Sequence, residues 1–231
     1  MLNIKGFIKL LFGVLVVSFM VSCASSPDSS ESNEPKVNLD AEEKKELKER
    51  QEKVGGSHSQ LKKLFQARRY KELLNEASKI LSKDPNDLRA LSVLGLYHLQ
   101  MNQLGAARIF FEKALVKHSD EAGLYNNIGV IQLKEGNLQA AIASFKKAQD
   151  MERGNATVQA NLGSIYVKYM DYVEAEPLVE DAYSVMSNNG IVANNYAIVL
   201  RTQGQYEEAA KVYTKALEKD SRNISTNLNY A

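Results

Sequence analysis

The chain has 231 residues, a formal net charge of +1 and a single cysteine, Cys23. One cysteine excludes a disulfide within the chain, and the near-neutral charge does not indicate the strongly basic face that nucleic-acid binding requires. The three histidines (His58, His98 and His118) lack the spacing typical of a metal site. We therefore expect no nucleic-acid partner, no metal and no other cofactor.

The first 22 residues combine a cationic start with a short apolar core. Lys5 and Lys9 precede an apolar run over residues 10–21, which is too short to span a bilayer comfortably and is typical of a secretory signal peptide. Residues 20–23 read Met-Val-Ser-Cys, so the cysteine directly follows a small residue. This segment resembles the cleavage site of bacterial lipoproteins, although methionine stands where that motif most often has leucine.

The resemblance implies a lipid anchor. Residues 1–22 would be a signal peptide that is removed, and Cys23 would carry acyl chains that hold the mature chain on a membrane. Ala24, rather than aspartate, after the cysteine is similar to the sorting signal for the outer membrane of Gram-negative bacteria, where the chain would face the periplasm. Two alternatives are an ordinary secretory signal that contains a cysteine and an uncleaved anchor helix.

The next segment favours an unfolded tether. Residues 24–36 are rich in serine, proline and acids and contain no large apolar side chain. The segment therefore has too little apolar surface to bury to offset the conformational entropy that folding would cost. We predict that residues 23–39, beginning at the lipidated cysteine, form a flexible tether between the lipid and the folded body.

A short charged helix is predicted over residues 40–56. Asp40 and Glu43 have the spacing of a capping box, and Glu46 lies four residues before Arg50, which favours a helix. The segment has almost no apolar residue to bury, so a solvated helix is favoured over a docking element. The glycine pair 55–56 is expected to end it.

From residue 88 onward, small side chains recur at intervals of 34 residues. Counted from the first residue of each unit, they occupy column 8 (Gly95, Gly129, Gly163, Ala197), column 20 (Ala107, Ala141, Ala175, Ala209) and column 27 (Ala114, Ala148, Ala182, Ala216). This period, with an apolar helix on each side of a turn, indicates a solenoid of stacked helix pairs. The predicted units are 88–121, 122–155, 156–189 and 190–223, preceded by a degenerate capping unit, 54–87.

These columns resemble the signature positions of tetratricopeptide repeats (TPRs). The resemblance covers residues 54–231 and implies an all-α fold, a right-handed superhelix of helix-turn-helix units. We name the first helix of each unit the A helix and the second the B helix. The proline that usually ends a unit is present only at Pro85, whereas Pro177 falls inside the B helix of unit 156–189. We expect Pro177 to kink that helix or to shift its start.

The small columns predict close packing within each unit. We expect column 8 of the A helix to face alanine on the B helix, so that the two backbones approach closely. The large residues of column 24 would then fill the gap toward the next unit; they are Phe111, Phe145, Val179 and Tyr213. Column 15 lies in the turn and holds Gly136 and Gly204, and glycine suits the left-handed backbone that often closes a helix.

Residues 224–231 match the start of a further repeat, with Tyr230 and Ala231 in the columns of Tyr196 and Ala197. We expect this repeat to be truncated. Truncation would leave apolar surface on the preceding unit uncovered and would favour self-association.

The sequence contains no recognisable catalytic constellation, so we predict a protein that is not an enzyme. Helical spacing places columns 2, 5, 6, 9, 12 and 13 of the A helices on one side. Column 6 reads Val93, Asn127, Asn161, Asn195 and Asn229, and side-chain amides can both donate to and accept from an extended peptide. We predict that this asparagine ladder binds peptide together with apolar and cationic neighbours: Leu96, Leu99, Val130, Leu133, Lys134, Val167, Lys168, Ile198 and Arg201. The alternative is that the amides only bond neighbouring helices.

These features favour a protein-interaction scaffold in the bacterial envelope, whose concave groove binds an extended or helical segment of a protein partner. The architecture is similar to the pilotin lipoproteins that help type IV pilus secretins assemble, and to some gliding-motility lipoproteins. Two alternatives stay open. The chain would be the repeat part of a longer protein with a catalytic region beyond Ala231, or it would be a structural spacer.

Overall fold

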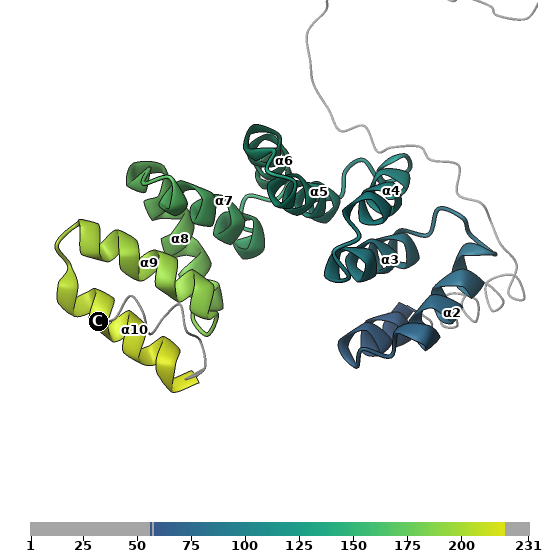
Figure 1. Cartoon of the computed structure of the whole chain (residues 1–231), viewed down its shortest axis with the longest axis horizontal. Helices are drawn as coiled ribbons and strands as arrows, with labels where there is room; N and C mark the ends of the chain where they lie inside the picture. The colour runs from purple at the N-terminus through teal and green to yellow at the C-terminus, as the bar shows by residue number, and fades with distance from the viewer. Residues whose placement is uncertain (1–55, 57, 220–231) are drawn as a thin grey trace, which may run out of the picture. The chain divides into compact units, whose positions relative to one another are not determined.

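All regular structure in the described part of the chain is α-helical, which confirms the fold class predicted from the sequence. The structure is a computed structural model, and it describes residue 56 and residues 58–219. Residues 58–66 are helical. The helices that follow are α2 (Tyr70–Leu81), α3 (Leu88–Gln100), α4 (Leu104–Leu115), α5 (Ala122–Lys134), α6 (Leu138–Met151), α7 (Ala156–Lys168), α8 (Tyr172–Met186), α9 (Gly190–Thr202) and α10 (Tyr206–Lys219) (Figure 1).

The helices pack in consecutive pairs along the chain. The A helices α3, α5, α7 and α9 each contact the B helix that follows, which is α4, α6, α8 and α10, respectively. The B helices α4, α6 and α8 also contact the next A helix, and α7 contacts α9 directly. Because these contacts join neighbouring elements, the core passes from one pair to the next, as in a solenoid.

The three glycines of column 8 (Gly95, Gly129 and Gly163) each lie very close to a side chain of the B helix in their own pair. A Cβ atom added to Gly95 would lie 2.5 Å from Cε1 of Phe111, and one added to Gly129 would lie 2.7 Å from Cε1 of Phe145. The prediction that column 8 faces alanine is therefore wrong, because it faces the large column 24 of its own unit. The B-helix ring occupies the space that an A-helix side chain would need, and glycine leaves that space open.

The same rings also help to join one pair to the next. Phe111 lies in a buried cluster with Leu124 and Ile128 of the following A helix, α5. Phe111 thus packs against glycine within its unit and belongs to the core shared with the next unit.

The first pair reverses the sizes at this contact. Leu61 stands in column 8 and Ala77 in column 24, and both are buried in one cluster that also contains Ala90 of α3. Units 88–121 and 122–155 combine glycine with phenylalanine, whereas this unit combines leucine with alanine, so the summed side-chain volume changes less than either position alone. The unit that looks degenerate in the sequence therefore fills its core with the large side chain on the A helix and the small one on the B helix.

The turns between A and B helices share one backbone conformation. Column 15 has a positive φ in each described turn: Arg68 (55°), Asn102 (57°), Gly136 (83°), Met170 (62°) and Gly204 (78°). The left-handed conformation expected of the two glycines is confirmed. A residue with a Cβ adopts it at a cost of about 1–2 kcal/mol, so the turn is imposed by the packing of the two helices.

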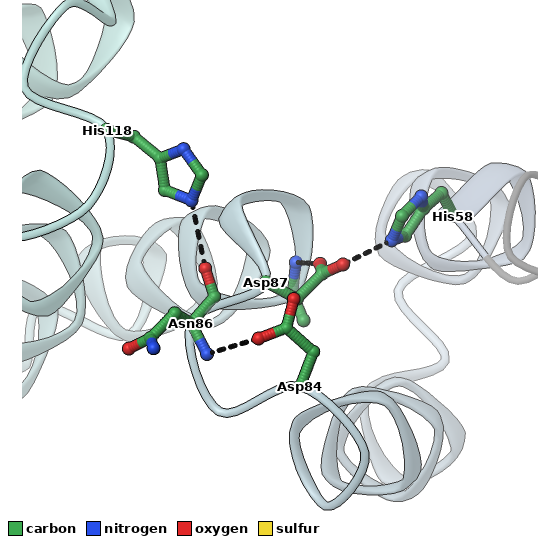
Figure 2. Close-up of polar contacts among 6 residues, drawn as sticks. His58, Asp84, Asn86, Asp87 and His118 are labelled. Atoms are coloured by element: carbon green, nitrogen blue, oxygen red, sulfur yellow. Dashed lines mark hydrogen bonds and ion pairs between the residues drawn. The ribbon is translucent and has the colours of Figure 1, made fainter. Parts of the chain in front are cut away.

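Side chains from three elements hold the loop between α2 and α3 (Figure 2). Asp87 caps α3, because its Oδ1 accepts a hydrogen bond from the Ala90 amide at 2.8 Å. Its Oδ2 accepts one from Nε2 of His58 at 2.8 Å, and these two side chains are 12% and 11% exposed. His118, which follows α4, donates from Nε2 to the Asn86 carbonyl at 3.0 Å. Two histidines that are distant in sequence therefore fix the same loop.

Pro177 lies inside α8, yet α8 begins at Tyr172, in the same column as the first residue of α4, α6 and α10. Of the two effects expected of Pro177, the shift of the helix start does not occur, and the kink stays a prediction. The proline removes the hydrogen bond to the Val173 carbonyl, and both residues are exposed, so water can reach that carbonyl.

Replacing Pro177 with alanine is expected to stabilise the protein by about 1 kcal/mol, because it restores one helical hydrogen bond. Ala143 occupies the same column in α6 and supplies the matched control, since A143P should destabilise. Urea unfolding of both variants checks this. A lower stability for P177A would show that α8 depends on the proline.

Several predicted segments lie outside the described residues. They are the signal peptide 1–22, the tether 23–39 with Cys23, all but Gly56 of the charged segment 40–56, and residues 224–231 with Asn229. Gly56 itself is helical, and the predicted end of the charged helix falls outside the described residues. Among the described helices, none has the length and apolar character needed to cross a membrane.

Candidate functional site

The structure joins parts of the asparagine ladder by hydrogen bonds between successive A helices. Nδ2 of Asn161 on α7 donates to Oδ1 of Asn126 on α5 at 2.8 Å. Nδ2 of Asn195 on α9 donates to Oγ of Ser164 on α7 at 2.7 Å. The ladder residues therefore link α5 to α7 and α7 to α9, which is the structural role left open by the sequence.

The three described asparagines differ in what they can offer a ligand. Asn195 is only 9% exposed, and both Asn161 and Asn195 already donate to a neighbouring helix. Asn127 is half-buried, and its side chain makes no hydrogen bond to any other described residue. Because a side-chain amide can donate and accept at once, Asn127 is the described ladder residue whose whole hydrogen-bonding capacity is open.

The predicted apolar neighbours contribute unequal surface. Val167 is 8% exposed and packs with Val179 and Val199, so it belongs to the core. Leu133 is the most exposed of the set at 37%. The others are half-buried and pack against the buried clusters; they are Leu96, Leu99, Val130 and Ile198.

The three predicted cations are exposed, but their surroundings differ. Nζ of Lys168 lies 6.0 Å from the centre of the Tyr169 ring. Arg201 lies by the buried Tyr213 of its own pair: burial raises the pKa of the Tyr213 hydroxyl, and a hydrogen bond from Arg201 lowers it in part. Lys134 makes no ion pair with another described residue and is directly available to an acidic or carbonyl group of a ligand.

Two residues of this surface, Asn126 and Ser164, were not predicted from the sequence. Asn126 stands in column 5 and Ser164 in column 9, and each accepts a hydrogen bond from a column 6 asparagine of the next unit. The adjacent pairs 126–127 and 194–195 are both Asn-Asn. This repeated doublet is the sequence feature that could have indicated a role for column 5. Among the described residues, no three His, Cys, Asp or Glu side chains are placed to hold a metal ion together.

The paired helices, the column 8 contacts and the shared turn conformation define an α-helical repeat protein of the solenoid class. Two tetratricopeptide repeat family models match the sequence, one over residues 93–156 and one over residues 191–223. These segments are tetratricopeptide repeats, as their columns predicted. No curated protein matches the chain.

Several solved structures share the fold. The structure of pilF from Pseudomonas aeruginosa is 20% identical, with a TM-score of 0.66 over 78% of this chain and 82% of that one. A thermophilic TPR protein of Thermus thermophilus is 19% identical, with a TM-score of 0.59 over 76% and 96%. YrrB, described as a TPR protein with an unusual peptide-binding site, is 16% identical, with a TM-score of 0.52 over 80% and 96%. At these identities the similarity shows the fold alone.

Proposed function

We propose that this chain is a non-enzymatic scaffold that binds a segment of a partner protein along the A helices α5, α7 and α9. The observation that carries the proposal is the open amide of Asn127 on α5, together with the exposed side chains of Leu133 and Lys134 nearly two turns further along the same helix. The amide can bond to the backbone of an extended peptide, the leucine can contact an apolar side chain, and the lysine can pair with an acidic group. The TPR segments support this function, since such repeats generally serve as protein-interaction modules.

Replacing Asn127 with alanine separates binding from stability. The side chain bonds to no described neighbour, so we expect unfolding free energy to stay within about 0.5 kcal/mol of the parent. Partner recovery should fall at least tenfold when the protein is used to capture partners from envelope extract and the products are quantified by mass spectrometry.

Asn195→Ala is the matched structural control for this experiment. It removes the bond to Ser164 and is expected to cost about 1 kcal/mol. If Asn127→Ala leaves every captured protein unchanged, the A-helix face is not the binding surface. In that event the bonds made by Asn161 and Asn195 favour the alternative function, a structural spacer.

The lipid anchor is the second part of the proposal. The sole cysteine stands at the position where the lipoprotein signal requires it, and Ala24 supports outer-membrane sorting toward the periplasm. Cys23→Ser should abolish labelling with a radioactive fatty acid and release the protein from membranes. Cys23→Ser protein that still sediments with membranes would contradict lipid anchoring.

We further propose that the scaffold assists assembly of an envelope machine, a pilus secretin or a motility apparatus. The combination of a lipoprotein signal with TPR segments supports this, and the fold shared with pilF is compatible with it. Deleting the gene in a piliated host should reduce secretin multimers on detergent gels while secretin monomers accumulate. Normal multimers together with normal motility would contradict this role.

A further inference from the structure

A pocket lies between α8, α9 and α10, and none of its lining residues belongs to the asparagine ladder. Its polar and aromatic lining comes from Glu180 and Tyr183 on α8, Tyr196 on α9, and Glu208, Lys211 and Lys215 on α10. Only Tyr196 belongs to an A helix, and it stands in column 7 rather than in a predicted groove column. The pocket is therefore a separate surface, formed mainly by B helices.

Two stacked tyrosines form the aromatic part of the pocket. The ring centres of Tyr183 and Tyr196 lie 5.0 Å apart, with 29° between the ring planes. Both side chains are half-buried, so the stack is held by the core and still reaches the surface. Nζ of Lys215 lies 5.8 Å from the centre of the Tyr183 ring, which shows that a cation is accommodated over this ring.

The carboxylates of the pocket are not equivalent. Glu208 pairs with Nζ of Lys211 at 2.9 Å. Glu180 makes no ion pair or hydrogen bond with any other described residue, although it lines the same pocket. A carboxylate that is open to solvent beside two ring faces is a ready acceptor for a cationic donor.

The negative charges of these acids raise the pKa of the tyrosine hydroxyls. Burial is the main cause that raises the pKa of Tyr183, and the charge of Glu208 raises it further. Burial also raises the pKa of Tyr196, with additional contributions from Glu180 and Glu208. Glu208 therefore lies close enough to influence both tyrosine hydroxyls, and Glu180 that of Tyr196.

We propose that this pocket binds an arginine side chain of a partner protein. A guanidinium group is planar, so it can stack on a tyrosine ring while its N–H groups bond in a fork to the Glu180 carboxylate. A lysine ammonium is a strongly hydrated point charge and can satisfy only one of these contacts well. The site is independent of the peptide-binding surface proposed above, because the two share no residue.

The test uses the full chain in mild detergent, with isotope-labelled tyrosine rings followed by NMR. The ring signals of Tyr183 and Tyr196 are assigned by single Tyr→Phe substitutions. Titration with N-acetyl-arginine amide should shift these two signals in a saturable manner, with a dissociation constant on the order of millimolar. N-acetyl-lysine amide should bind several-fold more weakly, and equal binding of the two would overturn the stacking geometry.

Glu180→Gln should weaken arginine binding about fivefold to tenfold, because it removes the charge but keeps the shape. Glu174→Gln is the matched control: it lies in the first turn of the same helix, outside the pocket, and should leave binding unchanged. The unshifted signals of Tyr125 and Tyr166 show that each variant is folded. An E180Q protein that binds as well as the parent would overturn the proposal.

Lys215→Met tests the same site in the opposite direction. Removing the chain's own cation from the Tyr183 ring frees that ring face, so arginine binding should strengthen several-fold. Weaker binding in K215M would contradict the assignment of the ring face to the ligand. Binding of arginine amide with no response of either tyrosine signal would also overturn it.

Discussion

Gly129→Ala is expected to destabilise the protein by about 1–3 kcal/mol, although it adds only one methyl group. On an exposed helix the same change would stabilise, since alanine has the higher helix propensity. Here the new Cβ would lie 2.7 Å from the ring of Phe145, which is fully buried and cannot move without disturbing the next pair. Steric overlap should therefore outweigh helix propensity. Urea unfolding measures the loss, and amide hydrogen exchange should place it in α5 and α6.

Gly123→Ala is the internal control, because Gly123 lies on the same helix and a Cβ there meets nothing within 4 Å. That variant should be as stable as the parent or slightly more so. Equal effects of G123A and G129A would show that the column 8 contact is not tight in solution.

A double variant tests the size exchange seen in the first pair. Combining G129L with F145A reproduces the arrangement of Leu61 and Ala77. The double variant should be more stable than G129L alone, with a coupling of about 1–3 kcal/mol. Additive losses would mean that the first pair depends on other differences.

Asp87→Ala is expected to cost about 2 kcal/mol, because two interactions end at one carboxylate (Figure 2). The Ala90 amide would lose its cap, and His58 would lose the partner of a nearly buried ring nitrogen. Since His58 belongs to the first pair and Ala90 to the second, hydrogen exchange should rise on both sides of this junction. Thermal unfolding gives the overall loss.

Asp171→Ala supplies the comparison, because Asp171 also precedes a helix, α8, but its side chain makes no capping hydrogen bond. That change should alter stability by less than about 0.5 kcal/mol. If D87A is no worse than D171A, the junction is held by apolar packing alone.

The repeat predicted the helices and their faces, because a column defines an angular position on a helix. It did not give the partner of each column across the unit. Gly95 was assigned an alanine partner, and the structure places the Phe111 ring there, since two helices of known faces can still be rotated or shifted against each other. Met170 carries no preference for a left-handed backbone, and only its shared column with Gly136 indicated that conformation.

The candidate site shows the same division between position and bonding. Column 6 correctly aligned Asn127, Asn161 and Asn195 on successive A helices. Which amides would bond to neighbours depended on side-chain rotamers and on Asn126 and Ser164, which lie in other columns. His58 and His118 looked unrelated for a similar reason, because helix stacking brings both to one loop.

The hydrogen bonds between neighbouring A helices join residues that are 35 and 31 positions apart in the sequence. The glycine and phenylalanine of each close contact are separated by about half as many residues. A chain whose contacts are this local closes only short loops as it folds. Low contact order favours fast folding, and each helix pair can form as soon as its own residues are available. The described solenoid should therefore fold progressively from one end, before the remaining residues of the chain are available.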